Sequence, residues 1–383
     1  MSEAFSADWL ATADEAIVAR AERELEALVA VSSPSGDIGS AEELCAVVSA
    51  LLPAEAGIER PPCSTPGYAP DLLATVRGTG TGRVLLLGHL DTVVAHPDHR
   101  PLEDHGDRLV GSGAVDMKGG MALALGVMRE LAGISDAFAE LSLLAVMDEE
   151  WRVGGFAHAP RFAGYDACLC FEAGELDDRG DDAVIARRKA ASTLQVTAAG
   201  RAAHSGAAPE RGRSALLALS ETARRVAAIS DPCGEDRLTS VPTVMHSGDA
   251  FNVVPAGGEL ICDLRADSLE AFERVVGTVP PELDGVALDA RLVRRWPGMD
   301  TREVASRLLA PAQALLGRPL VAGERGGASD ASHMATRVPL TLCGLGPRGG
   351  RAHNPDEFVL RDSLRPRAEV ALAVTAAAVS AIV

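Results

Sequence analysis

Short apolar runs recur through the first half of the chain, and each is bounded by glycine or polar residues. Runs of this length and composition are typical of buried strands in an α/β sheet. They predict strands at Asp71–Val76, Val84–Leu87, Leu141–Met147 and Ala167–Phe171. Between them, Lys118–Leu131 has apolar residues at helical spacing and predicts a helix.

The pattern changes between residues 187 and 295. Strands and helices are predicted there in the order β-α-β-β-α-β, at Ser192–Ala198, Ser214–Ile229, Pro242–Met245, Gly258–Arg265, Leu269–Val276 and Leu288–Val293. This is the order of a ferredoxin-like α+β domain. The α/β pattern then resumes, with a helix at Thr301–Leu316, a strand at Pro339–Cys343 and a last helix at Arg367–Val383. A chain of 383 residues favours two domains. We therefore expect an α/β domain formed by residues 1–186 and 296–383, interrupted by an inserted domain at 187–295.

Composition narrows the function. The 36 basic and 54 acidic residues give a net charge of −18, which argues against a nucleic-acid partner. The chain has no apolar run long enough to span a membrane, and its start lacks the basic and apolar segments of a signal peptide. Seven scattered cysteines suit a reducing compartment, so we expect a cytoplasmic protein with no membrane partner. Cys168 and Cys170 are interpreted as core residues of a strand rather than metal ligands.

Polar side chains follow the predicted strands at their carboxyl ends. His89 and Asp91 follow one strand, Glu149 and Glu150 the next, and Glu172 a third. Ligands of open α/β sheets bind at this edge.

Two further residues complete a set of metal ligands. Asp116 lies in a glycine-rich segment and His353 near the end of the chain. Two imidazoles and three carboxylates suit two divalent cations that share one carboxylate, and zinc accepts such ligands. We expect His89 and Glu172 to hold one ion, His353 and Glu150 the other, and Asp116 to bridge them. Asp91 is expected to receive the second N–H of His89, and Glu149 to be the general base.

In this order along the chain, the motifs resemble those of the M20 metallopeptidases. The resemblance rests on Gly88-His89-Leu-Asp91, Gly111–Gly120, Asp148-Glu149-Glu150, Phe171-Glu172, Gly200–Gly206, Asn252–Pro255, Gly326–Asp330 and His353. It implies a di-zinc aminopeptidase-like catalytic domain with an inserted lid that forms a homodimer, and a cis peptide bond between Asp116 and Met117. Cobalt or manganese is possible in place of zinc.

The resemblance also implies residues that contact the substrate. His204 corresponds to a lid histidine that stabilises the oxyanion, although it could be an ordinary turn residue. Asn252 and Arg265 correspond to lid residues that bind a substrate carboxylate, and Arg265 could instead form an ordinary ion pair within its strand. Gly327 and Ser329 belong to a loop that resembles the family's substrate-binding loop.

Glu172 occupies a position at which the aminopeptidase and dipeptidase branches have aspartate, so the chain resembles the carboxypeptidase and deacylase side. We expect hydrolysis of an amide beside a free carboxylate, in a short peptide or an N-acyl amino acid, most like glutamate carboxypeptidase. An N-acyl-amino-acid deacylase, releasing acetyl or succinyl, is the alternative within enzymes. A metal-binding regulatory protein is the alternative from another class. Trp151-Arg152-Val153, directly after the acidic pair, departs from the family's pattern.

Overall fold

The computed structural model describes residues 4–380. The chain forms two compact units. Unit 1 comprises Met1–Arg187, Asp300–Glu324 and Ser329–Val383, and unit 2 comprises Arg188–Met299 and Arg325–Ala328. None of the helices among residues 4–380 is both long and apolar enough to cross a membrane.

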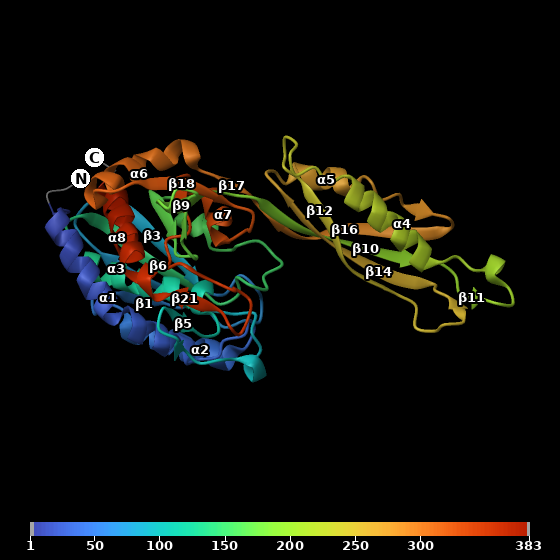
Figure 1. Ribbon diagram of the computed structural model, residues 1–383, viewed down its shortest axis with the longest axis horizontal. Helices are drawn as coiled ribbons and strands as arrows, with labels where there is room; N and C mark the ends of the chain where they lie inside the picture. The colour runs from blue at the N-terminus through green and yellow to red at the C-terminus, as the bar shows by residue number, and fades with distance from the viewer. Residues whose placement is uncertain (1–3, 381–383) are drawn as a thin grey trace. The chain divides into compact units, whose positions relative to one another are not determined.

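Unit 1 is built on a six-stranded sheet in the order β1-β2-β6-β3-β7-β19. Strands β1, β3 and β6 of this sheet are labelled in Figure 1. Its strands are β1 (Gly57–Glu59), β2 (Leu72–Arg77), β3 (Gly82–His89), β6 (Phe138–Val146), β7 (Ala167–Cys170) and β19 (Thr341–Leu342). Strand β3 runs parallel to both of its neighbours, β6 and β7. The central strands are buried on both faces because helices and loops cover both; in β3 every residue except Arg83 is buried, whereas the edge strand β1 is exposed. These elements confirm the predicted α/β fold class.

Helices cover this sheet, and several pack on one another. They are α1 (Ala7–Val29), α2 (Ile38–Leu51), α3 (Gly119–Ala132), α6 (Arg302–Leu316), α7 (Asp330–Ala335) and α8 (Leu364–Ser380). Helices α3 and α8 contact β3, and α1 packs against both helices. Helix α8 corresponds to the predicted helix Arg367–Val383, of which residues 381–383 lie outside the described part of the chain.

Two smaller sheets extend unit 1. One has the order β20-β21-β5-β4, formed by Gly349–Gly350, Phe358–Leu360, Arg108–Val110 and Glu103–Asp104. The other contains β17 (Met299–Asp300), β9 (Asp182–Arg188) and β18 (Leu320–Arg325), and β8 (Glu175–Leu176) pairs with β9. Cys168 and Cys170 on β7 are buried, in agreement with their interpretation as core residues.

Unit 2 has an antiparallel sheet in the order β12-β14-β10-β16-β15. Its strands are β10 (Ala190–Ala199), β12 (Thr239–Ser247), β14 (Gly257–Ala266), β15 (Glu282–Leu283) and β16 (Val286–Trp296). Helices α4 (Ala215–Ala228) and α5 (Glu270–Val276) pack on this sheet and bury a core that includes Leu219 and Phe272. A separate two-stranded antiparallel sheet pairs β11 (Ala203–His204) with β13 (Val253–Val254).

Candidate metal centre

Three adjacent parallel strands end at one edge of the unit 1 sheet, and each delivers a functional side chain there. His89 is the last residue of β3. Glu149 and Glu150 follow the end of β6, and Glu172 follows the end of β7. Because β6, β3 and β7 are neighbours in this order, the chain concentrates carboxylates and an imidazole at a single sheet edge.

Asp116 reaches the same place from the turn Ala114–Lys118 that leads into α3. The carboxylate of Glu357 fixes this turn, because its Oε1 accepts the backbone N–H groups of Val115 at 2.6 Å and Asp116 at 2.7 Å. Glu357 is only 2% exposed, and burial raises its pKa to about 8. The Asp116–Met117 peptide bond is cis, as the family resemblance implies.

The two oxygens of Asp116 face two different imidazoles. Oδ1 lies 3.1 Å from Nε2 of His89, and Oδ2 lies 3.3 Å from Nε2 of His353. His353 Nε2 is also 3.2 Å from Oε2 of Glu150. Ligand atoms of His89, Asp116 and Glu172 lie within 4.8 Å of one another, and so do those of Asp116, Glu150 and His353.

These two groups suit two cations with Asp116 shared between them. Each group offers one imidazole nitrogen, one carboxylate of its own and one oxygen of Asp116. Imidazole and carboxylate are ligands that zinc accepts. The structure therefore brings together all five residues that the sequence analysis selected as ligands.

The pKa shifts of these residues reflect the high density of carboxylates at the site. Burial alone would lower the pKa of His89, but its hydrogen bonds to Asp116 and Asp91 raise it well above the usual value. Hydrogen bonds to Asp116 and Glu150 raise the pKa of His353 to about 11. Burial favours protonation of Asp116, yet the two imidazoles hold the pKa of that carboxyl well below its usual range. The carboxylates thus attract positive charge, which bound cations would supply.

Asp91 joins His89 to the segment after β6. Nδ1 of His89 lies 3.1 Å from the Asp91 backbone carbonyl and 3.4 Å from its Oδ1, so the carbonyl is the closer acceptor. The Asp91 carboxylate accepts the backbone N–H groups of Glu149 at 3.1 Å and Glu150 at 3.2 Å, and the hydroxyl of Ser35 at 2.5 Å. Sequence analysis predicted the link to His89 but missed the link to the acidic pair.

Glu149 lies beside the five ligands and is 8% exposed. Burial raises its pKa to about 7, and the nearby Glu150 and Asp116 carboxylates add to the shift. A carboxyl group with this pKa is suited to exchanging protons near neutral pH.

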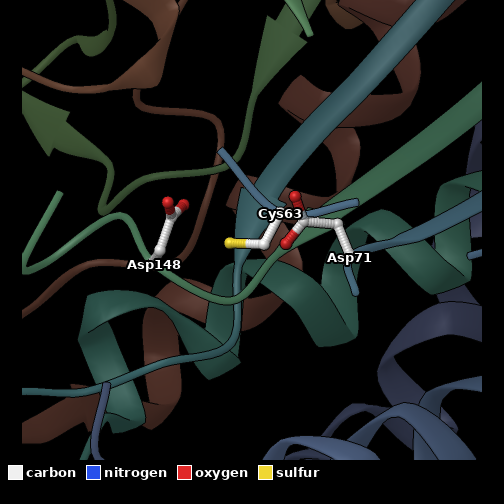
Figure 2. Close-up of side chains that lie close together, drawn as sticks. All are labelled: Cys63, Asp71 and Asp148. Atoms are coloured by element: carbon white, nitrogen blue, oxygen red, sulfur yellow. The ribbon is translucent and has the colours of Figure 1, made fainter. Parts of the chain in front are cut away.

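A second group of ligand-type side chains is formed by Cys63, Asp71 and Asp148, the last of which directly precedes the acidic pair (Figure 2). All four carboxylate oxygens of this group already bond to protein donors: the Asp71 oxygens to the Met147 N–H and to His158, and the Asp148 oxygens to Thr65 and Arg152. Burial and the two carboxylates raise the pKa of the Cys63 thiol, which keeps it protonated. We interpret this group as a support that fixes residues 147 and 148, and the sequence analysis did not identify it.

Arg152 extends that support. It is 1% exposed, its Nη1 donates to Asp148 at 2.7 Å, and its Nη2 pairs with Asp330 at the start of α7. Its guanidinium also lies 4.7 Å from the ring centroid of Phe156. The buried arginine therefore connects the acidic segment to α7.

Four residues selected for catalysis or substrate binding belong to unit 2: His204, Asn252, Arg265 and Gly327. Nδ1 of the exposed His204 accepts the N–H groups of Gly206 and Ala207, both at 3.2 Å, which places the proton of the neutral imidazole on Nε2.

Two of the selected residues already have partners within their own unit. Arg265 forms a two-point ion pair with Asp263, at 3.0 and 3.1 Å, so the alternative considered for it is present in the structure. The Gly327 carbonyl accepts from Arg188 at 2.7 Å. Ser329, in unit 1, is fully buried with its hydroxyl 3.5 Å from the Cys343 sulfur.

Known proteins resemble this chain along most of its length. The model of Peptidase family M20/M25/M40 matches residues 85–377. Carboxypeptidase G2 of Pseudomonas sp. (strain RS-16) is 28% identical over 316 residues, which cover 78% of this chain and 74% of the relative. Acetylornithine deacetylase of Klebsiella pneumoniae (strain 342) is also 28% identical, over 331 residues that cover 78% of this chain and 81% of the relative. The solved structure of aminopeptidase PepT from Bacillus cereus ATCC 10987 superposes with a TM-score of 0.77 at 18% identity, covering 94% of this chain and 98% of that one.

Proposed function

The chain belongs to peptidase family M20/M25/M40, and on that premise we propose that it is a two-zinc hydrolase that cleaves an amide bond beside a free carboxylate. The observation that carries the proposal is the arrangement of Asp116. Its two oxygens face His89 and His353, with Glu149 buried next to them. Cobalt or manganese could replace zinc, since the ligand set does not fix the metal.

Each ligand group would hold one ion: His89 and Glu172 the first, His353 and Glu150 the second, with Asp116 common to both. When bound, two such cations polarise the scissile carbonyl and lower the pKa of water. Asp91 would orient the His89 imidazole and the acidic pair, because it contacts His89 and the backbone N–H groups of Glu149 and Glu150.

Glu149 is the proposed general base. It would accept a proton from the attacking water and deliver it to the departing amine, which requires a carboxyl group that is readily protonated and deprotonated. Its burial supports this role, because a buried carboxyl group binds a proton more readily than an exposed one.

The substrate residues are proposed from the family resemblance. His204 would donate from Nε2 to the oxyanion, and the bonds at its Nδ1 support that tautomer. Asn252 and Arg265 would bind the substrate carboxylate, for which Arg265 would have to exchange its bond to Asp263. Gly327 and Ser329 would line the substrate loop, with Ser329 acting through its backbone because its side chain is buried.

Two substrate classes have an amide beside a free carboxylate: short peptides and N-acyl amino acids. Similarity to carboxypeptidase G2 favours release of a carboxyl-terminal residue from a short peptide, and similarity to acetylornithine deacetylase favours an N-acyl amino acid. We place the carboxypeptidase reaction first, in line with Glu172 and the matched motifs.

We also propose that the protein is a cytoplasmic homodimer joined through unit 2. Strand β12 is an edge of its sheet and exposes Val241 and Val244, while α4 exposes Leu217. An unpaired edge with exposed apolar side chains suits association with a second copy. All seven cysteines are free thiols, which fits a reducing compartment. Light scattering of the purified chain would test the dimer.

The experiment that tests the function measures amine release from N-acyl amino acids and from dipeptides with glutamate, aspartate or a neutral residue at the carboxyl end. Each is incubated with zinc, with cobalt and with a chelator. We expect chelator-sensitive hydrolysis of the substrates that carry a free carboxylate beside the amide. Equal hydrolysis of carboxyl-blocked analogues would contradict the proposal.

A further inference from the structure

An exposed tryptophan directly follows a proposed metal ligand. Trp151 comes immediately after Glu150, whose Oε2 lies 3.2 Å from His353, and the Trp151 residue is 63% exposed. Consecutive Cα atoms are only about 3.8 Å apart, so the backbone of Trp151 lies directly beside that of a proposed ligand. Glu149 and Glu150 precede it without interruption.

The residues on either side hold Trp151 in this position. Glu150 points to His353, and the next residue, Arg152, is 1% exposed and paired with Asp148 and Asp330. The side chains therefore alternate: Glu150 and Arg152 are held by unit 1, whereas Trp151 and Val153 are exposed, the latter at 59%. Because Glu150 contacts His353 and the buried Arg152 pairs with Asp148 and Asp330, Trp151 is exposed within a segment whose two neighbouring side chains are held.

The other two tryptophans are placed as apolar residues usually are. Trp296 is fully buried, and Trp9 packs edge to face on Phe5 with ring centroids 4.8 Å apart. Burial of a large aromatic side chain is strongly favourable. A ligand that covers the exposed indole of Trp151 would therefore gain binding free energy.

Two glycines that follow Trp151 are also unobstructed. Side chains built at Gly154 and Gly155 would meet no atom within 4 Å. The segment from Trp151 to Gly155 thus offers an indole, an exposed valine and unobstructed backbone. A ligand group could lie flat on the indole without displacing protein atoms.

We propose that Trp151, with Val153, binds the acyl part of the substrate, and that this acyl part is apolar and preferably aromatic. The inference rests on the proposed function, because it assigns one side of the scissile amide to this surface. The carboxylate of the substrate belongs on the other side, since an indole offers it only one N–H and Glu149 and Glu150 repel it. An aromatic acyl group would instead stack on the indole.

The first test compares two substrates that differ only in the acyl group. The N-acetyl and N-phenylacetyl forms of one amino acid are hydrolysed by the zinc-loaded protein, and kcat/KM is measured for each. We expect the wild type to prefer phenylacetyl, Trp151→Ala to lower that preference about tenfold, and Trp151→Phe to keep most of it. Ile58→Ala is the matched control, because Ile58 is a 47% exposed apolar residue of β1 in the same unit. Its preference should equal that of the wild type.

The second test reads binding without turnover. Acrylamide quenching of tryptophan fluorescence is measured in the zinc-loaded protein with phenylacetate or with acetate, and Trp151→Phe supplies the signal of the other two tryptophans. We expect phenylacetate to shield Trp151 and acetate to leave it accessible. Shielding without hydrolysis of any substrate would support the binding surface while refuting the proposed function. Hydrolysis with no shielding, and with the same acyl preference in Trp151→Ala as in the wild type, would overturn the inference and leave the proposed function intact.

Discussion

Five carboxylates, those of Asp91, Asp116, Glu149, Glu150 and Glu172, gather near the ends of β3, β6 and β7, and their contacts suggest different tasks. Asp116 contacts His89 and His353, whereas Glu150 contacts His353 alone. The backbone N–H groups of Glu149 and Glu150 both donate to Asp91, but only the Glu150 carboxylate belongs to a group of ligand atoms. Membership of these groups separates the proposed ligands from the proposed base.

Replacement of the base should stop turnover and leave the metals in place. We expect Glu149→Gln to lower kcat by about 10²–10⁴-fold, because an amide cannot accept the proton. Turnover and metal content are measured on the same preparation. Glu24→Gln is a matched control, since Glu24 on α1 is also buried, at 7% exposed, but pairs with Arg129 on α3. Wild-type turnover in Glu149→Gln would exclude this residue as the base.

Replacement of the shared ligand should affect both ions. Asp116→Ala removes an oxygen from each ligand group, so we expect metal content after dialysis to fall from about two ions per chain to less than one. Glu172→Ala removes a ligand from one group and should retain about one ion. Elemental analysis of both variants checks the difference. Equal loss in the two variants would argue against a bridging role for Asp116.

Sequence reasoning succeeded for residues that follow strands. His89, Glu149, Glu150 and Glu172 could be predicted because apolar runs identify strands, and parallel strands deliver their next residues to one edge. Glu357 could not, because its carboxylate acts on backbone N–H groups 241 and 242 positions earlier in the chain. No local pattern records such a contact.

At the scale of elements, Arg152 ties the segment after β6 to α7. We expect Arg152→Met to destabilise unit 1 by about 3 kcal/mol or more, because Asp148 and Asp330 are then buried without their cation. Thermal unfolding is compared with that of Arg161→Met, which breaks the exposed Arg161–Glu59 pair and should cost less than about 1 kcal/mol. Similar losses in both variants would contradict the role given to Arg152.

Helix α1 meets α8 through an ion pair that should make stability depend on pH. Burial raises the pKa of Asp14 to about 6, although Arg365 lies 2.6 Å away. The Asp14 carboxyl therefore binds a proton more tightly in the folded chain than in the unfolded chain. Ionisation of Asp14 lowers the free energy of unfolding, and this loss is absent below about pH 4 and complete above about pH 6. We expect Asp14→Asn to be more stable than the wild type at pH 7.5, with the gap closing as the pH falls towards 4. Unfolding midpoints across this range test the sign, and a gap that widens on acidification would refute it.

The elements that sequence reasoning missed are explained by length and by context. Strands β4, β5, β20 and β21 have two or three residues each, too few to show alternation. Helix α1 was also not predicted, although its sequence contains the signal: Ile17, Ala21, Leu25 and Leu28 are spaced as on one helical face, and the structure buries them. By contrast, the apolar strands β3, β6 and β7 are largely buried, and each overlaps a predicted strand with bounds that differ by at most three residues.

At the scale of the whole molecule, we expect metal binding to stabilise unit 1 directly and unit 2 not at all. All five proposed ligands belong to unit 1, which also holds Glu149. A cation that binds only the folded form stabilises it by about 2.7 kcal/mol at a free concentration of one hundred times its Kd. This stabilisation acts on the structure that contains the ligands.

Chelation should therefore loosen unit 1 and spare unit 2. We expect hydrogen exchange to accelerate in β3 and β7 when zinc is removed, because His89 and Glu172 then lose the cation between them, while β10 and β14 exchange at unchanged rates. Asp116→Ala is the control, since it should show fast exchange in β3 and no further response to chelator. If chelator accelerates exchange equally in β10 and β14, metal binding stabilises both units together, and the assignment of every ligand to unit 1 is incomplete.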